Sequence, residues 1–146
     1  MKTLIASLIA LFSLALGAAA AEEPALDGYC PVCYIAAEKA VKGTDEFAVE
    51  HDGRTYLFVS ADAMKAFQAE PDKFLPQYDG LCAYGMAFGK KFESDPTVFS
   101  VVDGKLYLNK DKSIGKKFNE DPEGFIAKAD PEWKAIKMKM EKEMKK

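Results

Sequence analysis

The sequence predicts an α+β fold in which two similar halves, each made of a cysteine loop, a β-hairpin and a helix, pack as one small body. Three observations predict it. The chain repeats itself at a shift of 51 residues, from Asp52 to Asp103. Each copy has an Asp-Gly pair between strand-like runs, and each pair is followed by a helix signal. A hairpin with one helix cannot close a core alone, so the two copies are expected to share one.

Residues 1–20 read MKTLIASLIALFSLALGAAA and have the pattern of a secretory signal peptide. Lys2 provides the positive start, an apolar run follows, and Ala18-Ala19-Ala20 forms a cleavage site of the A-x-A type. The apolar run is short for a membrane span and ends in small residues. We therefore expect an exported, periplasmic or secreted protein with no stable membrane span after signal removal.

The repeat defines two units, residues 28–79 and residues 80–130. Residues 52–75 read DGRTYLFVSADAMKAFQAEPDKFL, and residues 103–126 read DGKLYLNKDKSIGKKFNEDPEGFI. Upstream, GYCPVC from Gly28 matches GLCAYG from Gly80. Glycine, proline and three aromatic positions stay in register, which indicates a duplication.

Each unit is expected to contain a hairpin. In unit 1, FAVEH and RTYLFVS flank Asp52-Gly53; in unit 2, FSVV and KLYLN flank Asp103-Gly104. An Asp-Gly pair between alternating apolar residues is the strongest short hairpin signal, because both turn positions need a positive φ.

A helix is expected after each hairpin. Ser60 can cap the first, which carries Met64 and Phe67 on its inner face and ends before Pro71. Unit 2 repeats this plan with a cap at Asp111, inner residues Ile114 and Phe118, and a restart at Asp121-Pro122. Phe67 and Phe118 should be buried at equivalent places, as should Phe74 and Phe125.

Residues 131–146, PEWKAIKMKMEKEMKK, are expected to form a charged C-terminal helical tail. Trp133 and Ile136 lie one turn apart and should dock on the body. The Lys-, Met- and Glu-rich end is expected to be a solvated face.

The composition excludes several classes of function. Removal of residues 1–20 takes away Lys2 and no acidic residue, leaving 19 basic and 23 acidic side chains and a formal charge of −4. A nucleic-acid-binding protein needs a basic face, so no nucleic-acid partner is expected. His51 is the single histidine, which leaves no Ser/His/Asp set, and no glycine-rich phosphate loop is present. We therefore expect a non-enzyme.

Cys30, Cys33 and Cys82 are the candidate metal ligands. The Cys-x-x-Cys pair places two thiolates within reach of one ion, and Cys82 holds in unit 2 the position of Cys30 in unit 1. Zinc would need two further ligands beyond the pair. Copper(I) accepts fewer and softer ligands, so copper is the first expectation and zinc the second.

Two alternatives to a metal remain open. Cysteines of exported proteins pair in oxidising compartments, so one disulfide and one leftover thiol would fit three cysteines. Thiol–disulfide exchange needs a Cys-x-x-Cys pair at a helix N-terminus, and residues 34–43 could supply a short helix. His51, beside the Asp-Gly turn, is expected to be a solvated turn residue, and Met64 a core residue.

The series CPVC, VEHDGRTYLFVS, the helix with Phe67, and EPDKF resembles the YHS domain, a small metal-associated module. The resemblance covers Cys30 to Tyr78, and residues 80–130 look like a degenerate copy. Metal-associated members carry further cysteines in a pattern like F-C-S-x-x-C, whereas residues 58–63 here read FVSADA. The resemblance therefore implies the fold more than a full four-cysteine site.

The sequence predicts an exported small protein that binds or handles a soft metal such as copper through Cys30 and Cys33, with help from Cys82. The alternative is a non-enzymatic structural or interaction module with a disulfide in that place. Beyond the metal ion, the sequence identifies no particular protein partner.

Export gives the first testable prediction. The intact mass of the exported protein should correspond to a chain that begins at Ala21 or Glu22. A mature chain that still begins at Met1 would contradict the assignment of a cleaved signal.

Overall fold

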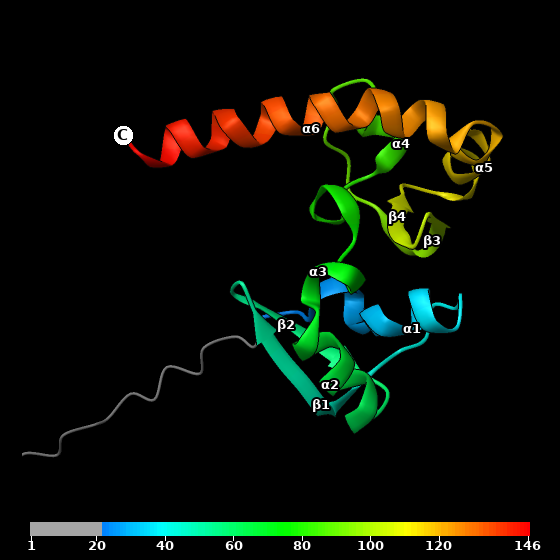
Figure 1. The fold of residues 1–146 in the computed structure, drawn as a ribbon, viewed down its shortest axis with the longest axis vertical. Coiled ribbons are helices and arrows are strands. Elements are labelled where there is room, and N and C mark those ends of the chain that lie inside the picture. The colour runs from blue at the N-terminus through cyan, green and yellow to red at the C-terminus, as the bar shows by residue number, and fades with distance from the viewer. Residues whose placement is uncertain (1–21) are drawn as a thin grey trace, which may run out of the picture.

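The computed structural model describes residues 22–146, and the predicted signal segment 1–20 lies outside this range. It shows an α+β body built from two units with the same order of elements (Figure 1). Unit 1 contains η1 (Ala25–Gly28), α1 (Pro31–Ala36), β1 (Thr44–His51), β2 (Arg54–Phe58), α2 (Ala61–Ala69) and α3 (Pro71–Phe74). Unit 2 contains η2 (Gln77–Gly80), α4 (Ala83–Met86), β3 (Asp95–Val102), β4 (Lys105–Asn109), α5 (Lys112–Glu120) and α6 (Pro122–Met144). The predicted fold class is confirmed.

Both predicted hairpins form two-stranded antiparallel sheets, β1–β2 and β3–β4. Asp52 and Gly53 have φ values of 49° and 76°, and Asp103 and Gly104 have 50° and 73°. Two successive positive φ values define the tight turn whose twist matches that of the flanking strands, which explains the Asp-Gly pairs. Each sheet also has a register shift at the matching place, after Thr44 in β1 and after Asp95 in β3.

The helix signals are confirmed at the level of single atoms. The Ser60 hydroxyl accepts a hydrogen bond from the Ala63 N–H at 3.1 Å, and the Asp111 carboxylate accepts one from Ile114 at 2.9 Å. Both contacts satisfy an N–H that has no partner within the helix. Pro71 and Pro122 then occupy the first turn of the next helices, where the missing N–H costs nothing.

The matching elements begin at η1 and η2, a few residues before the predicted unit starts at 28 and 80. In η1, Leu26, Asp27 and Gly28 all have positive φ, and Tyr78, Asp79 and Gly80 repeat this in η2. The turn Gln77–Gly80 therefore belongs structurally with unit 2.

The C-terminal segment is not a separate helix. α6 runs without interruption from Pro122 to Met144, through Pro131 and across the predicted limit between residues 130 and 131. Trp133 and Ile136 pack against the unit 2 core, as predicted. The end of α6 extends beyond the body (Figure 1), and its methionines Met138, Met140 and Met144 are exposed.

Each unit has an aromatic core at the matching place. Phe67 and Phe118 are fully buried, and their rings lie 5.3 Å from Tyr56 and 5.8 Å from Tyr107, centroid to centroid. The predicted burial of Phe67 and Phe118 is confirmed. Phe74 is also buried, whereas Phe125 is only partly buried.

The two units meet through α1 of unit 1 and the β3–β4 hairpin of unit 2. Tyr34 is fully buried there with Leu106 and Leu108. Its hydroxyl donates a hydrogen bond to the Pro96 carbonyl at 2.7 Å, and its ring packs edge-on against Phe99 at 5.0 Å. Burial raises the pKa of Tyr34 well above its ordinary value, so the phenol stays protonated.

The burial of Phe67 predicts a large stability loss on truncation. Phe67→Ala should lower the free energy of unfolding by about 3–5 kcal/mol, because a buried aromatic leaves a cavity. Gln68→Ala, at an exposed position of the same helix, should change it by less than about 0.5 kcal/mol. Urea unfolding followed by circular dichroism measures both, and equal stability of the two variants would contradict the assigned core.

Candidate functional site: the Cys30–Cys33 thiol pair

The start of α1 holds the Cys30–Cys33 pair. Cys30 precedes the helix with extended backbone angles (φ −70°, ψ 117°), and Pro31 takes the first helical position. The Cys33 N–H lies 3.2 Å from the Cys30 carbonyl oxygen, which closes the first turn. One helical turn thus brings both thiols to the same end of α1. The short helix expected after CPVC is confirmed.

The pair lies inside the unit 1 core rather than on a surface loop. Cys30 is 0% exposed and Cys33 is 9% exposed. Both belong to a cluster that is dominated by aromatic side chains, namely Tyr56, Phe58, Phe67 and Phe74. Both thiols are thus largely screened from water and from dissolved reagents.

Burial controls the chemistry of the pair. Desolvation, and after it the neighbouring Cys30 thiol, together raise the pKa of Cys33 from its ordinary 9.0 to about 12. An apolar environment disfavours the thiolate, which is the nucleophilic form of cysteine. A catalytic thiol would need the opposite shift, so these surroundings weigh against thiol–disulfide exchange at neutral pH.

Cys82 occupies the equivalent place in unit 2, directly before α4, with φ −57° and ψ 116°. It is buried, and its thiol lies 3.6 Å from Oδ1 of Asn109, which also accepts the Tyr84 N–H at 3.0 Å. Asn109 stands where unit 1 has Phe58. Cys82 is therefore held by an amide in its own unit, and its surroundings differ from the aromatic cluster around Cys30.

The second thiol of the pair has no counterpart in unit 2. Gly85 stands where unit 1 has Cys33, and a Cβ at Gly85 would lie 2.7 Å from a ring carbon of Phe92. Phe92 has therefore taken the space that a second cysteine side chain would need.

The three cysteines do not form the predicted group. Among residues 22–146, no set of three or more His, Cys, Asp or Glu side chains is placed to hold a metal ion. The reason is the way in which the units pack. They meet through Tyr34 and the β3–β4 hairpin, while Cys30 and Cys33 lie in the unit 1 core and residues of α4 lie in the unit 2 core. Equivalent positions in the repeat are thus not neighbours in space.

The remaining soft or titratable candidates have clear places. Met64 packs against the unit 1 core, in agreement with its expected role. His51 is not a solvated turn residue, because its ring packs edge-on against Phe67 at 5.6 Å and its side chain is only 26% exposed. Arg54 was not among the expected site residues. His51 and Arg54 are the single histidine and the single arginine of the chain, and they flank Asp52-Gly53. This pairing of rare residues at one turn could have identified the end of the β1–β2 hairpin as a candidate site.

Comparison with models of known protein families, with curated proteins and with solved structures found no match. Within residues 22–146, none of the helices combines the length and the apolar character needed to cross a membrane.

The raised pKa predicts slow thiol chemistry in the reduced, folded protein. At pH 9, alkylation of Cys33 by iodoacetamide should be far slower than in urea-unfolded protein, because the folded thiol stays protonated and covered until the pH approaches 12. Mass spectrometry of the alkylated peptides measures the rate at each cysteine. Equal rates for Cys33 in the folded and unfolded chains would contradict its burial.

Proposed function

We propose that this chain is an exported, non-enzymatic protein that binds one soft monovalent metal ion, copper(I) before any other, through Cys30 and Cys33 alone. The single observation that carries the proposal is the pair of adjacent sulfur atoms, without a third His, Cys, Asp or Glu ligand among the described residues. Two thiolates satisfy copper(I), whereas tetrahedral zinc needs four ligands. Cys82 is left out of this site, in contrast to the expectation from the sequence.

Two further arguments support the proposal. The pair packs with hydrophobic side chains of the unit 1 core, Phe58, Phe67 and Phe74 among them, and such surroundings favour a soft ion over a hard one. The residues from Cys30 to Tyr78 resemble the metal-associated YHS domain. Export is part of the proposal because residues 1–20 have the pattern of a signal peptide.

Metal titration tests the proposal. Reduced protein without residues 1–20, refolded from urea under nitrogen with copper(I) supplied by a chromogenic chelator, should take up one equivalent of the metal. Cys30→Ser and Cys33→Ser should each abolish this uptake, because one thiolate cannot compete with the chelator. Cys82→Ser is the matched control and should bind like the wild type. Binding by Cys30→Ser, or loss of binding in Cys82→Ser, would contradict the two-thiol site.

The raised pKa of Cys33 adds a pH signature to the same titration. Below a pKa of about 12, metal must displace the Cys33 proton, so the apparent affinity should rise about tenfold per pH unit for each proton released. The Cys33 thiol stays protonated over roughly pH 6 to pH 9, so metal binding there must release its proton. An affinity that does not change over this range would mean that Cys33 is not a ligand.

A second candidate is a structural or interaction module in which Cys30 and Cys33 form a disulfide. Their burial among aromatic rings favours it, because a neutral disulfide costs less to bury than a charged thiolate. Protein isolated from its natural compartment decides between the two. In urea-unfolded samples, alkylation of three thiols, together with copper bound before unfolding, supports the metal site, whereas alkylation of Cys82 alone supports the disulfide. For so short a loop, loss of the disulfide in Cys30→Ser would cost about 2 kcal/mol.

A further inference from the structure

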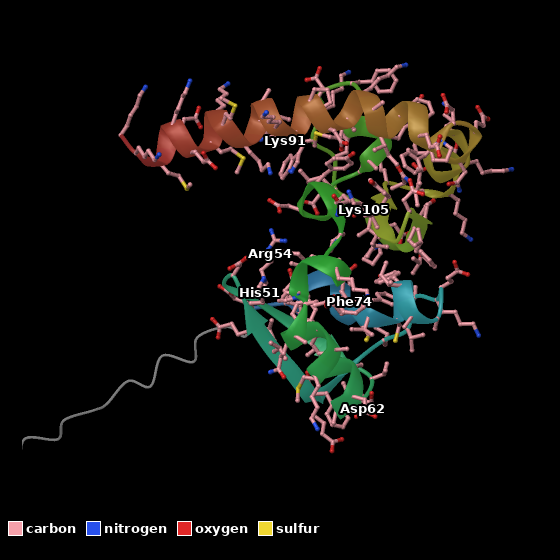
Figure 2. The ribbon with its side chains drawn as sticks, in the orientation of Figure 1. His51, Arg54, Asp62, Phe74, Lys91 and Lys105 are labelled. Atoms are coloured by element: carbon pink, nitrogen blue, oxygen red, sulfur yellow. The ribbon has the colours of Figure 1, made fainter. Side chains whose placement is uncertain are left out.

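A cavity lies at the turn end of the β1–β2 hairpin, apart from the thiol pair. It has a volume of about 290 Å³. Its polar side is formed by His51, Asp52, Arg54, Tyr56 and Asp79, and its apolar side by Leu26, Leu75 and Pro76. Figure 2 shows His51 and Arg54 at this end of the hairpin. The volume lies near the lower end of the range for small-molecule sites, so one small metabolite would fill it.

Unit 2 provides an internal comparison, because it has a cavity at the same place. That cavity has about 310 Å³ and is lined by Val102, Asp103, Lys105, Tyr107 and Asp130, the residues that match the polar side in unit 1. There the Tyr78 hydroxyl donates a hydrogen bond to the Asp130 carboxylate at 2.8 Å. The Asp130 carboxylate of unit 2 is therefore already bound by the protein.

Unit 1 lacks this internal partner. Leu26 stands where unit 2 has Tyr78, so no hydroxyl reaches Asp79 from that position. Within residues 22–146, neither Arg54 nor Asp79 forms an ion pair, although the Arg54 side chain is hydrogen-bonded to the Tyr56 hydroxyl. The cavity wall thus holds one guanidinium and two carboxylates, Asp52 and Asp79, and no ion pair joins Arg54 to either carboxylate.

His51 adds an unsatisfied polar atom to the same wall. Its Nε2 is buried and makes no hydrogen bond, although Oδ2 of Asp52 lies 3.3 Å away. A buried polar atom without a hydrogen bond is costly, and native proteins rarely keep one without a reason. A ligand that enters the cavity could supply the missing partner.

Positively and negatively charged side chains both affect the Tyr56 phenol in the cavity wall. Burial raises the pKa of the Tyr56 phenol, Arg54 opposes this rise, and Asp79 and Asp52 add to it. Arg54, Tyr56 and Asp79 thus line the same cavity, and the two charged side chains shift the pKa of the phenol in opposite directions.

We propose that this cavity binds a small zwitterion, an α-amino acid with a short apolar side chain. The carboxylate pairs with the Arg54 guanidinium, the ammonium group pairs with Asp79, and the side chain lies on Leu26, Leu75 and Pro76. Arg54 and Asp79 both reach solvent, and a ligand with a single charge would pair with only one of them. An α-amino acid carries both charges on adjacent carbons and matches the mixed wall.

Isothermal titration calorimetry of the chain without residues 1–20 tests the proposal with L-leucine, L-valine and L-alanine as probes. At least one should bind saturably. For the one that binds, the analogue without the ammonium group and the analogue without the carboxylate should each bind at least about tenfold more weakly. For L-leucine these are 4-methylpentanoate and 3-methylbutylamine. No binding of any of the three amino acids at millimolar concentration, or equal binding of either analogue, overturns the proposal.

Variants assign the two charges. Arg54→Gln and Asp79→Asn should each weaken binding by about 10- to 100-fold, the usual effect of removing a charged hydrogen-bond partner. Arg54→Lys keeps the charge and should retain more affinity than Arg54→Gln. Lys105→Gln, the matching position in unit 2, is the control and should bind like the wild type. Thermal unfolding confirms that each variant is folded. Unchanged binding in both Arg54→Gln and Asp79→Asn, or equal loss in Lys105→Gln, overturns the site.

Discussion

The buried contact of Tyr34 with unit 2 is the constraint on which the rest of this structure depends. Each unit has an aromatic core of its own, but Tyr34 of unit 1 and Leu106 and Leu108 of unit 2 are buried only because the units cover one another. Tyr34 joins them because its ring packs on Phe99 and its hydroxyl satisfies the Pro96 carbonyl in an apolar interface. An unpaired carbonyl there would cost about 1–3 kcal/mol, so this single hydroxyl fixes where the units meet. The same contact also keeps Cys82 apart from the Cys30–Cys33 pair, because docking through α1 leaves Cys82 within unit 2.

The duplication separates what the fold needs from what a site needs. Both units keep the positive-φ turns, the helix caps and a buried phenylalanine on a tyrosine. The positions that differ carry the polar and sulfur chemistry. Cys33 becomes Gly85 with Phe92 in its space, and His51 and Arg54 become Val102 and Lys105. In unit 2 the Tyr78 hydroxyl binds the Asp130 carboxylate, and Oδ1 of Asn109 holds Cys82 while its Nδ2 has no hydrogen-bond partner; in unit 1 neither Arg54 nor Asp79 forms an ion pair within residues 22–146. The two units therefore share one scaffold, and unit 1 holds the candidate sites.

Features set by neighbouring residues could be predicted from the sequence, and features set by packing could not. The Asp-Gly turns and the caps at Ser60 and Asp111 follow from local backbone chemistry. The burial of Phe67 and Phe118 follows from helical spacing. The separation of Cys82 from the Cys30–Cys33 pair depends on how the units dock, which no local pattern encodes. The cavity at His51 brings in Asp79 from beyond two helices, so its mixed charge appears only in three dimensions.

Burial decides how the thiol pair can change state. Cys30 and Cys33 lie beneath Phe58, Phe67 and Phe74, and an ion, a chelator or a reductant reaches them only when this cluster opens. Opening exposes the aromatic core of unit 1, so its free energy approaches that of unfolding the unit. The pair therefore keeps the state that it acquires as the chain folds, whether that is a bound metal ion or a disulfide. The charge of a thiolate pair in an apolar cluster works against the metal, while the softness of its two sulfur ligands favours copper(I). The balance is therefore settled in the compartment where the chain folds, because the closed core allows little exchange afterwards.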